Sequence, residues 1–176
     1  MGRNLTVEQG YAAARLVGLS MLGELRPRVR HQLTLTLPAP PIFVDGDPSR
    51  LPQAIGNLLH NGCKFMPRGG QLALTVEHEG EQAAIRVRDR GIGIAADQLP
   101  RIFDMFMQVD TSLERPVSGL GIGLTLVRNL VELHGGSVEA RSDGLGHGSE
   151  FILRLPVVES PRPSAIPAAR PAPRAD

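Results

Sequence analysis

The sequence is poor in cysteine and in aromatic residues, and it has no surplus of charge. Cys63 is the only cysteine among the 176 residues, so an internal disulfide and a cysteine-rich zinc site are both excluded. Tryptophan is absent and there is a single tyrosine, so binding of single-stranded nucleic acid by stacking lacks its usual side chains. The net charge is +1 and no lysine or arginine block is present, so we expect no nucleic-acid partner.

Long apolar runs and targeting signals are also missing. No stretch reaches the roughly 20 apolar residues of a membrane span, and the first residues do not resemble a signal peptide. We therefore expect this segment to be cytoplasmic and to make no membrane contact. A membrane-anchored parent protein would be compatible with that expectation.

The residues that are present suffice for one domain followed by a tail. Hydrophobic residues make up 41% of the sequence, which is enough to build an aliphatic core. After Pro156 the composition shifts to proline, alanine and arginine, which cannot bury enough apolar surface to fold. We predict a domain at residues 1–156 and a disordered linker or tail at 157–176.

Hydrophobic periodicity predicts alternating strands and helices within that domain. Leucine alternates with threonine in HQLTLTLP, and two further alternating runs flank a glycine-containing turn, which is typical of a hairpin. Strands are expected at 5–8, 31–38, 42–44, 71–79, 81–89, 137–143 and 149–156. A first helix is expected at 11–31. A second should run from Pro48, with Asp47 as its N-cap, to about Phe65. A third should run from about Leu124 and end at the Gly135–Gly136 pair.

The second of these predicted helices carries two asparagines and a lysine on one side. Asn57, Asn61 and Lys64 fall within about 60° of one another around the helix axis, next to an apolar stripe. Amide oxygens suit magnesium, which leaves most of its shell to phosphates and water, and lysine neutralises phosphate charge. This side of the helix fits a magnesium-bound polyphosphate, although it would equally fit a surface that faces water.

A glycine-rich stretch, DRGIGI, follows a predicted strand. Asp89 stands at the strand end, where a carboxylate can accept a hydrogen bond from an exocyclic amine. Gly91 and Gly93 come directly after it, and glycines allow a planar ring to approach the backbone closely. The stretch is therefore a candidate site for a nucleobase.

Two more glycine-rich stretches follow. Gly119, Gly121 and Gly123 lead into the helix that begins near Leu124, and the free N–H groups of a helix start form an anion site. The third stretch, GLGHGSEF, carries Ser149 and also fits a plain hairpin turn. The order of the three stretches carries more information than any one of them.

Five stretches, taken in order, resemble the sequence boxes of the catalytic ATP-binding domain of bacterial two-component sensor histidine kinases, in the GHKL superfamily. NLLHNGCKF, DRGIGI, IFDMFMQVD, GLGIGLTLV and GHGSEF correspond to the N, G1, F, G2 and third glycine boxes. The resemblance covers roughly residues 4–156. It implies an α/β (α+β) fold, namely a two-layer sandwich with a mixed β-sheet and helices on one face. It also implies that ATP binds between the helices and a mobile lid at about residues 104–118.

Matching positions imply a role for each site residue. Asn61 would be the Mg²⁺ ligand and Asn57 a possible second one, while Asp89 would bond the adenine amino group. Gly62 stands where the family usually has alanine, which removes no ligand. The full set of implied ATP-binding residues is Asn57, Asn61, Lys64, Asp89, Gly91, Gly93, Gly119, Gly121, Gly123, Leu124 and Ser149.

The residue four positions before the magnesium asparagine distinguishes kinases from hydrolases. The gyrase-like, Hsp90-like and MutL-like ATPases of the superfamily have a glutamate there, which activates water. This sequence has Asn57, and an amide does not accept a proton at neutral pH. The sequence therefore favours the histidine kinase branch, while a GHKL ATPase and a non-catalytic nucleotide-binding scaffold stay open as alternatives.

No histidine has the sequence context of a phosphoacceptor, which lies on a long helix and is followed by an acidic residue. We expect the phosphoacceptor hairpin to be absent from this chain, either because the sequence is a fragment or because the protein is a free-standing ATP-binding domain. Such a chain should bind ATP without autophosphorylation. Expected partners are ATP, the hairpin of a parent kinase, and a receiver domain or response regulator, since the tail resembles a hybrid-kinase linker. The five histidines considered are His31, His60, His78, His134 and His147.

Overall fold

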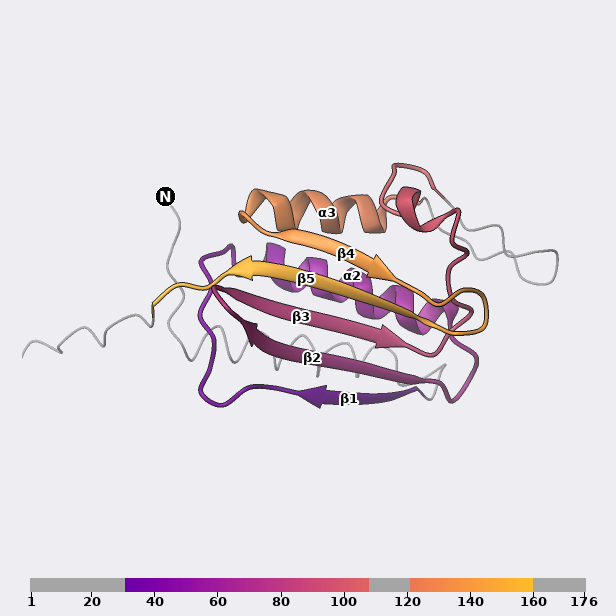
Figure 1. Cartoon of the computed structure of the whole chain (residues 1–176), viewed down its shortest axis with the longest axis horizontal. Coiled ribbons are helices and arrows are strands. Elements are labelled where there is room, and N and C mark those ends of the chain that lie inside the picture. Colours follow the sequence, from indigo (N-terminus) through magenta and orange to yellow (C-terminus); the bar gives the residue numbers. More distant parts are fainter. Residues whose placement is uncertain (1–30, 108–120, 160–176) are drawn as a thin grey trace, which may run out of the picture.

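The structure is a computed structural model, which we describe for residues 31–107 and 121–159 (Figure 1). Five strands form one sheet in the order β1-β2-β3-β5-β4. The first two strands pair in parallel and the other neighbours pair antiparallel, which confirms the predicted mixed sheet. The strands are β1 Gln32–Thr36, β2 Gln71–Glu79, β3 Gln82–Asp89, β4 Ser137–Arg141 and β5 Ser149–Pro156.

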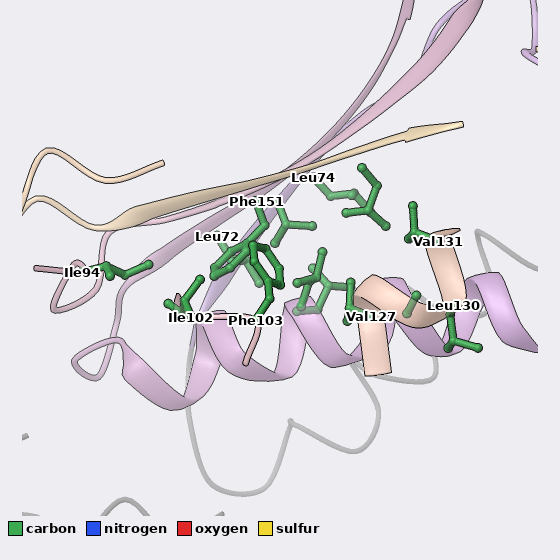
Figure 2. Close-up of a cluster of buried hydrophobic side chains, with 14 of the residues drawn as sticks. Leu72, Leu74, Ile94, Ile102, Phe103, Val127, Leu130, Val131 and Phe151 are labelled. Carbon is green, nitrogen blue, oxygen red and sulfur yellow. The ribbon is translucent and has the colours of Figure 1, made fainter. Parts of the chain in front are cut away.

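Two α-helices cover one face of this sheet. They are α2 (Arg50–Phe65) and α3 (Gly123–Leu133), and a short 3₁₀ helix, η1, spans Leu99–Arg101. Figure 2 shows the buried side chains between the sheet and the helices. The predicted two-layer sandwich is thus confirmed for the described part of the chain. Within that part, no helix combines the length and the apolar character needed to cross a membrane.

The core between the two layers is mainly aliphatic, as the scarcity of aromatic residues predicts. Leu58 from α2, Val127 from α3 and Leu153 from β5 have no solvent exposure. Phe103 and Phe151 add one edge-to-face aromatic pair, with ring centroids 6.3 Å apart (Figure 2). Burial of these side chains is the main force that holds α2 and α3 against the sheet.

The opposite face of the sheet carries a set of ion pairs beside the buried Ile152 and Ala84. Arg86 on β3 forms ion pairs with Glu77 and Glu79 on β2. Arg154 on β5 contacts Glu79 at 3.1 Å and Glu139 on β4 at 3.0 Å. These contacts link four strands side by side, so we call them the sheet-face ion network.

The start of α2 differs slightly from the prediction. The helix begins at Arg50 with Ser49 at the N-cap, so the predicted cap at Asp47 was two residues early. Asp47 Oδ1 nevertheless accepts hydrogen bonds from the N–H groups of Ser49 and Arg50, at 2.8 and 3.1 Å. The hydroxyl of Ser49 also donates to it, and this bond is the main cause of the lowered pKa of Asp47. Asp47 precedes the helix and nevertheless satisfies free N–H groups at its start.

The end of α3 confirms the predicted glycine stop. Gly135 has a positive φ of 70° and its N–H donates to Glu132 O, while Gly136 N–H donates to Val131 O. These two bonds form a Schellman motif. The preceding residue, His134, accepts the N–H of Asp47 at Nε2, 2.9 Å away, and thereby joins the end of α3 to the start of α2.

The predicted strand at 42–44 is wrong, because only one isolated antiparallel bridge forms there, between Val44 and Val157. Val157 N–H donates to Glu81 O and Val158 N–H donates to Phe43 O, each at 2.9 Å. The backbone is thus still bonded to the domain just beyond Pro156. The expected strand at 5–8, nearly all of the helix at 11–31, most of the lid and the tail from residue 160 lie outside the described residues.

Candidate functional site

Asp89 is a buried acid at the end of β3, with 5% exposure. Its Oδ1 accepts the N–H of Gly91 at 2.7 Å, and its Oδ2 accepts the hydroxyl of Ser149 at 2.5 Å. The antiparallel register pairs Asp89 with Ser149 directly, so the sheet itself brings these two predicted site residues together. Each carboxylate oxygen still has acceptor capacity for a further donor.

Helix α2 lies directly beside this acid. A Cβ placed on Gly62 would be 3.6 Å from Asp89 Cβ, and Gly62 is adjacent to Asn61 in the chain. The pKa of the neighbouring Cys63 thiol is raised, chiefly by burial and further by the charge of Asp89. The helix that carries the two asparagines and the strand-end acid therefore converge, as the sequence predicts.

The backbone after Asp89 turns over the C-terminal end of α2. Ile92 N–H donates to Phe65 O at 3.1 Å, and a Cβ on Gly91 would lie 2.6 Å from that same oxygen. Gly93 has a φ of 72° and faces Gly144 O, 2.1 Å from where its Cβ would be. Both positions are thus restricted to glycine by backbone contacts, and we call residues 91–94 the glycine loop.

Asn57, Asn61 and Lys64 all lie in α2 and all are partly exposed. On the surface of α2 they lie between the buried face, which includes Leu58, and the exposed face, which includes His60. Lys64 Nζ lies 5.0 Å from the ring centroid of Phe65. The structure therefore places the three predicted residues on one accessible face of the helix, two turns long.

This donor set fits magnesium better than it fits a metal held by acids or histidines. In residues 31–107 and 121–159, no cluster of three or more His, Cys, Asp or Glu side chains could hold a metal ion. The amide oxygens of Asn57 and Asn61 are hard, neutral ligands on the face described above. Magnesium requires few protein ligands when a polyphosphate supplies the others, so the residues present are compatible with it.

The second predicted phosphate-binding segment is described only in part. Gly119 falls outside the described residues, and so do residues 108–118 of the predicted lid. Gly121 O accepts the N–H of Phe106 at 3.1 Å. This bond joins the described residues just before the gap at 108–120 to those just after it. Gly123 begins α3, and Leu124 is half-buried against the core. The start of α3 is thus one residue earlier than expected.

One residue of this region, Ser142, was missed by sequence reasoning. Its Oγ accepts the N–H of Ile94 at 3.0 Å and donates to Gly148 O at 2.7 Å. It therefore connects the glycine loop to the turn between β4 and β5. The sequence gives no distinguishing signal, because a serine before Asp-Gly is typical of any turn.

Several known proteins are similar to this chain in sequence and in architecture. A family described as histidine kinase-, DNA gyrase B-, and HSP90-like ATPase matches residues 46–159. The sensor histidine kinase RcsC of Salmonella typhimurium is 42% identical over 132 residues, which are 73% of this chain and 14% of RcsC. The circadian input-output histidine kinase CikA of Synechococcus elongatus is 43% identical over 123 residues, 67% of this chain and 16% of CikA.

Among solved structures, full-length ShkA in complex with AMPPNP superposes with a TM-score of 0.68 at 27% identity. The match covers 89% of this chain and 32% of ShkA. The chain thus spans less than a fifth of the length of the two curated relatives named above. The mixed sheet with its helix layer and the buried acid at the end of β3 agree with the family match. The chain therefore belongs to the histidine kinase-, DNA gyrase B- and HSP90-like ATPase family of ATP-binding domains.

Proposed function

We propose that this chain is the ATP-binding catalytic domain of a two-component sensor histidine kinase. It supplies the γ-phosphate of ATP to a histidine on a separate dimerisation hairpin. Its relatives RcsC and CikA are histidine kinases, and the matched ShkA structure contains AMPPNP. The proposal extends these properties to the present chain.

The observation that carries the proposal is the position of Asp89 beside α2. A buried carboxylate with two fixed donors has a defined orientation, and it retains capacity to accept the 6-amino group of adenine. The missing side chains of Gly62 and Gly91 allow α2 and the glycine loop to approach the acid closely. The phosphates of a nucleotide whose base lies at Asp89 would extend toward Asn61 and Asn57 along α2.

A magnesium ion would be held by Asn61, with Asn57 as a possible second ligand. Bound there, the ion would neutralise charge on the phosphates. Lys64 would contribute a point positive charge from the same face of α2. Gly121, Gly123 and Leu124 near the start of α3, together with Gly119, would lie against the phosphates.

The amide at position 57 favours phosphoryl transfer over hydrolysis. Asn57 has no basic group at neutral pH, so α2 offers no carboxylate for activating water at that position. In the proposed transfer, an imidazole nitrogen forms a bond to the γ-phosphorus, the bond to the β,γ-bridging oxygen breaks, ADP leaves, and the imidazole proton goes to solvent. The partners would be the hairpin that carries this histidine and a receiver domain or response regulator.

Calorimetric titration of ATP with and without magnesium tests the binding site. Asn61→Ala should lower ATP affinity in magnesium by more than tenfold, since the loss of a metal ligand costs at least as much as the loss of an outer partner, while the thermal unfolding temperature stays the same. His60→Ala, an exposed change on the same helix, is the matched control. Unchanged ATP affinity of Asn61→Ala in magnesium would contradict the proposed metal ligand.

Phosphoryl transfer is tested with labelled ATP, magnesium and a separately supplied histidine hairpin from a related kinase. Label on the hairpin supports the kinase proposal. Release of inorganic phosphate without labelled hairpin would instead indicate an ATPase. Binding of ATP with neither product would indicate a nucleotide-binding scaffold.

A further inference from the structure

The Ser142 hydroxyl has every bonding position in use. A hydroxyl offers one donor and two acceptor positions. The Ser142 proton goes to Gly148 O at 2.7 Å, and the N–H groups of Ile94 and Gly144 donate to the oxygen at 3.0 and 3.3 Å. One half-buried side chain thus connects the glycine loop, at Ile94, to the β4–β5 turn, at Gly144 and Gly148.

The glycine loop and the β4–β5 turn both contact Asp89. Gly148 packs against the backbone of Asp89, where a Cβ would lie only 2.2 Å from Asp89 O. Ile94 closes the glycine loop, and Gly146 N–H donates to Ile92 O at 2.7 Å. The position of the loop relative to the acid therefore depends on the turn that Ser142 holds.

We propose that Ser142 is a positioning residue for recognition of the adenine ring. Its hydroxyl fixes the glycine loop and the β4–β5 turn at one separation from Asp89, and so favours a purine with a 6-amino group over one with a 6-carbonyl group. This inference rests on the proposed function, because it presumes that a nucleotide base lies at Asp89. The phosphate end of the site, on α2, has no contact with Ser142 among the bonds described above.

Ser142→Ala removes the acceptor for Ile94 N–H and the donor to Gly148 O. The loop then loses its fixed position, and the base should lose its favourable geometry with Asp89. We expect the affinity for ATP to fall about tenfold, the effect of losing one well-placed hydrogen bond. The affinity for inosine triphosphate, which has a carbonyl oxygen in place of the 6-amino group, should stay nearly constant.

The measurement is the ratio of the dissociation constants for inosine triphosphate and ATP, determined by titration of the full chain. Ser142→Thr keeps the hydroxyl and should restore the ratio of the unchanged protein. Ser137→Ala, an exposed serine on β4, is the matched control and should leave the ratio unchanged. Protection of the Ile94 amide from hydrogen exchange reports independently whether each variant keeps the bond.

Three results would overturn the inference. If Ser142→Ala lowers both affinities by the same factor, the serine has only a structural role. If the ratio is unchanged although Ile94 loses its protection, the bond does not affect base selection. If the unchanged chain binds neither nucleotide, the proposed function fails first, and the inference fails with it.

Discussion

Gly62 shows how a single missing side chain sets the distance between the two layers. The family resemblance leads one to expect alanine at this position, and glycine costs the helix up to about 1 kcal/mol of propensity. The structure gives the reason for glycine here. An added Cβ would lie 2.6 Å from Leu72 Cδ1 on β2, and Leu72 is 3% exposed, so the side chain of Leu72 occupies the space that alanine would need.

Gly62→Ala should therefore destabilise the fold by about 1 kcal/mol, because an overpacking cost of about 1–3 kcal/mol exceeds the gain in helix propensity. Leu72→Val shortens the opposing side chain. We expect the loss in free energy of unfolding of the double variant to be about 1 kcal/mol smaller than the sum of the losses of the two single variants. Urea unfolding of the four proteins of this cycle measures the coupling.

A matched cycle uses Leu74→Val in place of Leu72→Val. Leu74 lies on the same strand and the same face, but Leu72 supplies the nearest atom to the Gly62 position. The effects of Gly62→Ala and Leu74→Val should be additive. Equal coupling in both cycles would show that the steric explanation for Gly62 is wrong.

Among the elements, the end of α3 shows what sequence can predict about a helix boundary. The Gly135–Gly136 pair indicated a stop, and the Schellman motif confirms it. The two glycines are needed for different reasons, however. Gly135 requires its positive φ and has only Pro156 Cγ near its Cβ position, at 3.7 Å, whereas a Cβ on Gly136 would lie 2.2 Å from Arg154 O.

We therefore predict that Gly135→Ala costs about 1–2 kcal/mol, the penalty for an L-residue in the left-handed region, and that Gly136→Ala costs more. The second change forces a backbone atom of β5 to move, which also disturbs the pairing of β5 with β4. Thermal unfolding of both variants provides the comparison. Gly80→Ala is the control for the cost of a positive φ alone, since Gly80 has a φ of 62° and nothing lies within 4 Å of its Cβ position. A smaller loss for Gly136→Ala than for Gly135→Ala would contradict this account.

Most described elements could be predicted because their patterns are local. Alternation identified β1, the β2–β3 hairpin and the β4–β5 pair, and the face shared by Asn57 and Asn61 follows from helix geometry alone. The strand expected at 42–44 failed because a short apolar run does not show whether a partner strand lies beside it. Ser142 was missed for a similar reason, since its contact with Ile94 on the glycine loop is a tertiary contact between residues 48 positions apart.

At the scale of the whole molecule, the sheet-face ion network makes stability depend on pH. Bonding to Arg154 lowers the pKa of Glu79, and bonding to Arg141 is the main cause of the lowered pKa of Glu139. A carboxyl whose pKa is lower in the folded state stabilises the fold above its unfolded pKa. That stabilisation is lost as the pH falls through the folded value.

Stability measured by urea unfolding should therefore decrease as the pH drops below about 4, the range in which free glutamates become protonated. Glu79→Gln combined with Glu139→Gln should make this decrease less steep. Glu132→Gln on the exposed side of α3 is the control and should leave the slope unchanged. Identical slopes for all three proteins would show that the network does not contribute to acid sensitivity.

The antiparallel pairing of β3 with β5 fixes the distance between the end of β5 and the acid of the site. Gln82 pairs with Pro156 and Asp89 pairs with Ser149, so Pro156 at the end of β5 and the acid of the site stand about 23 Å apart, the length of seven strand steps. A fluorescent label on Val158, two residues beyond Pro156, would thus report one set separation from a nucleotide whose base lies at Asp89.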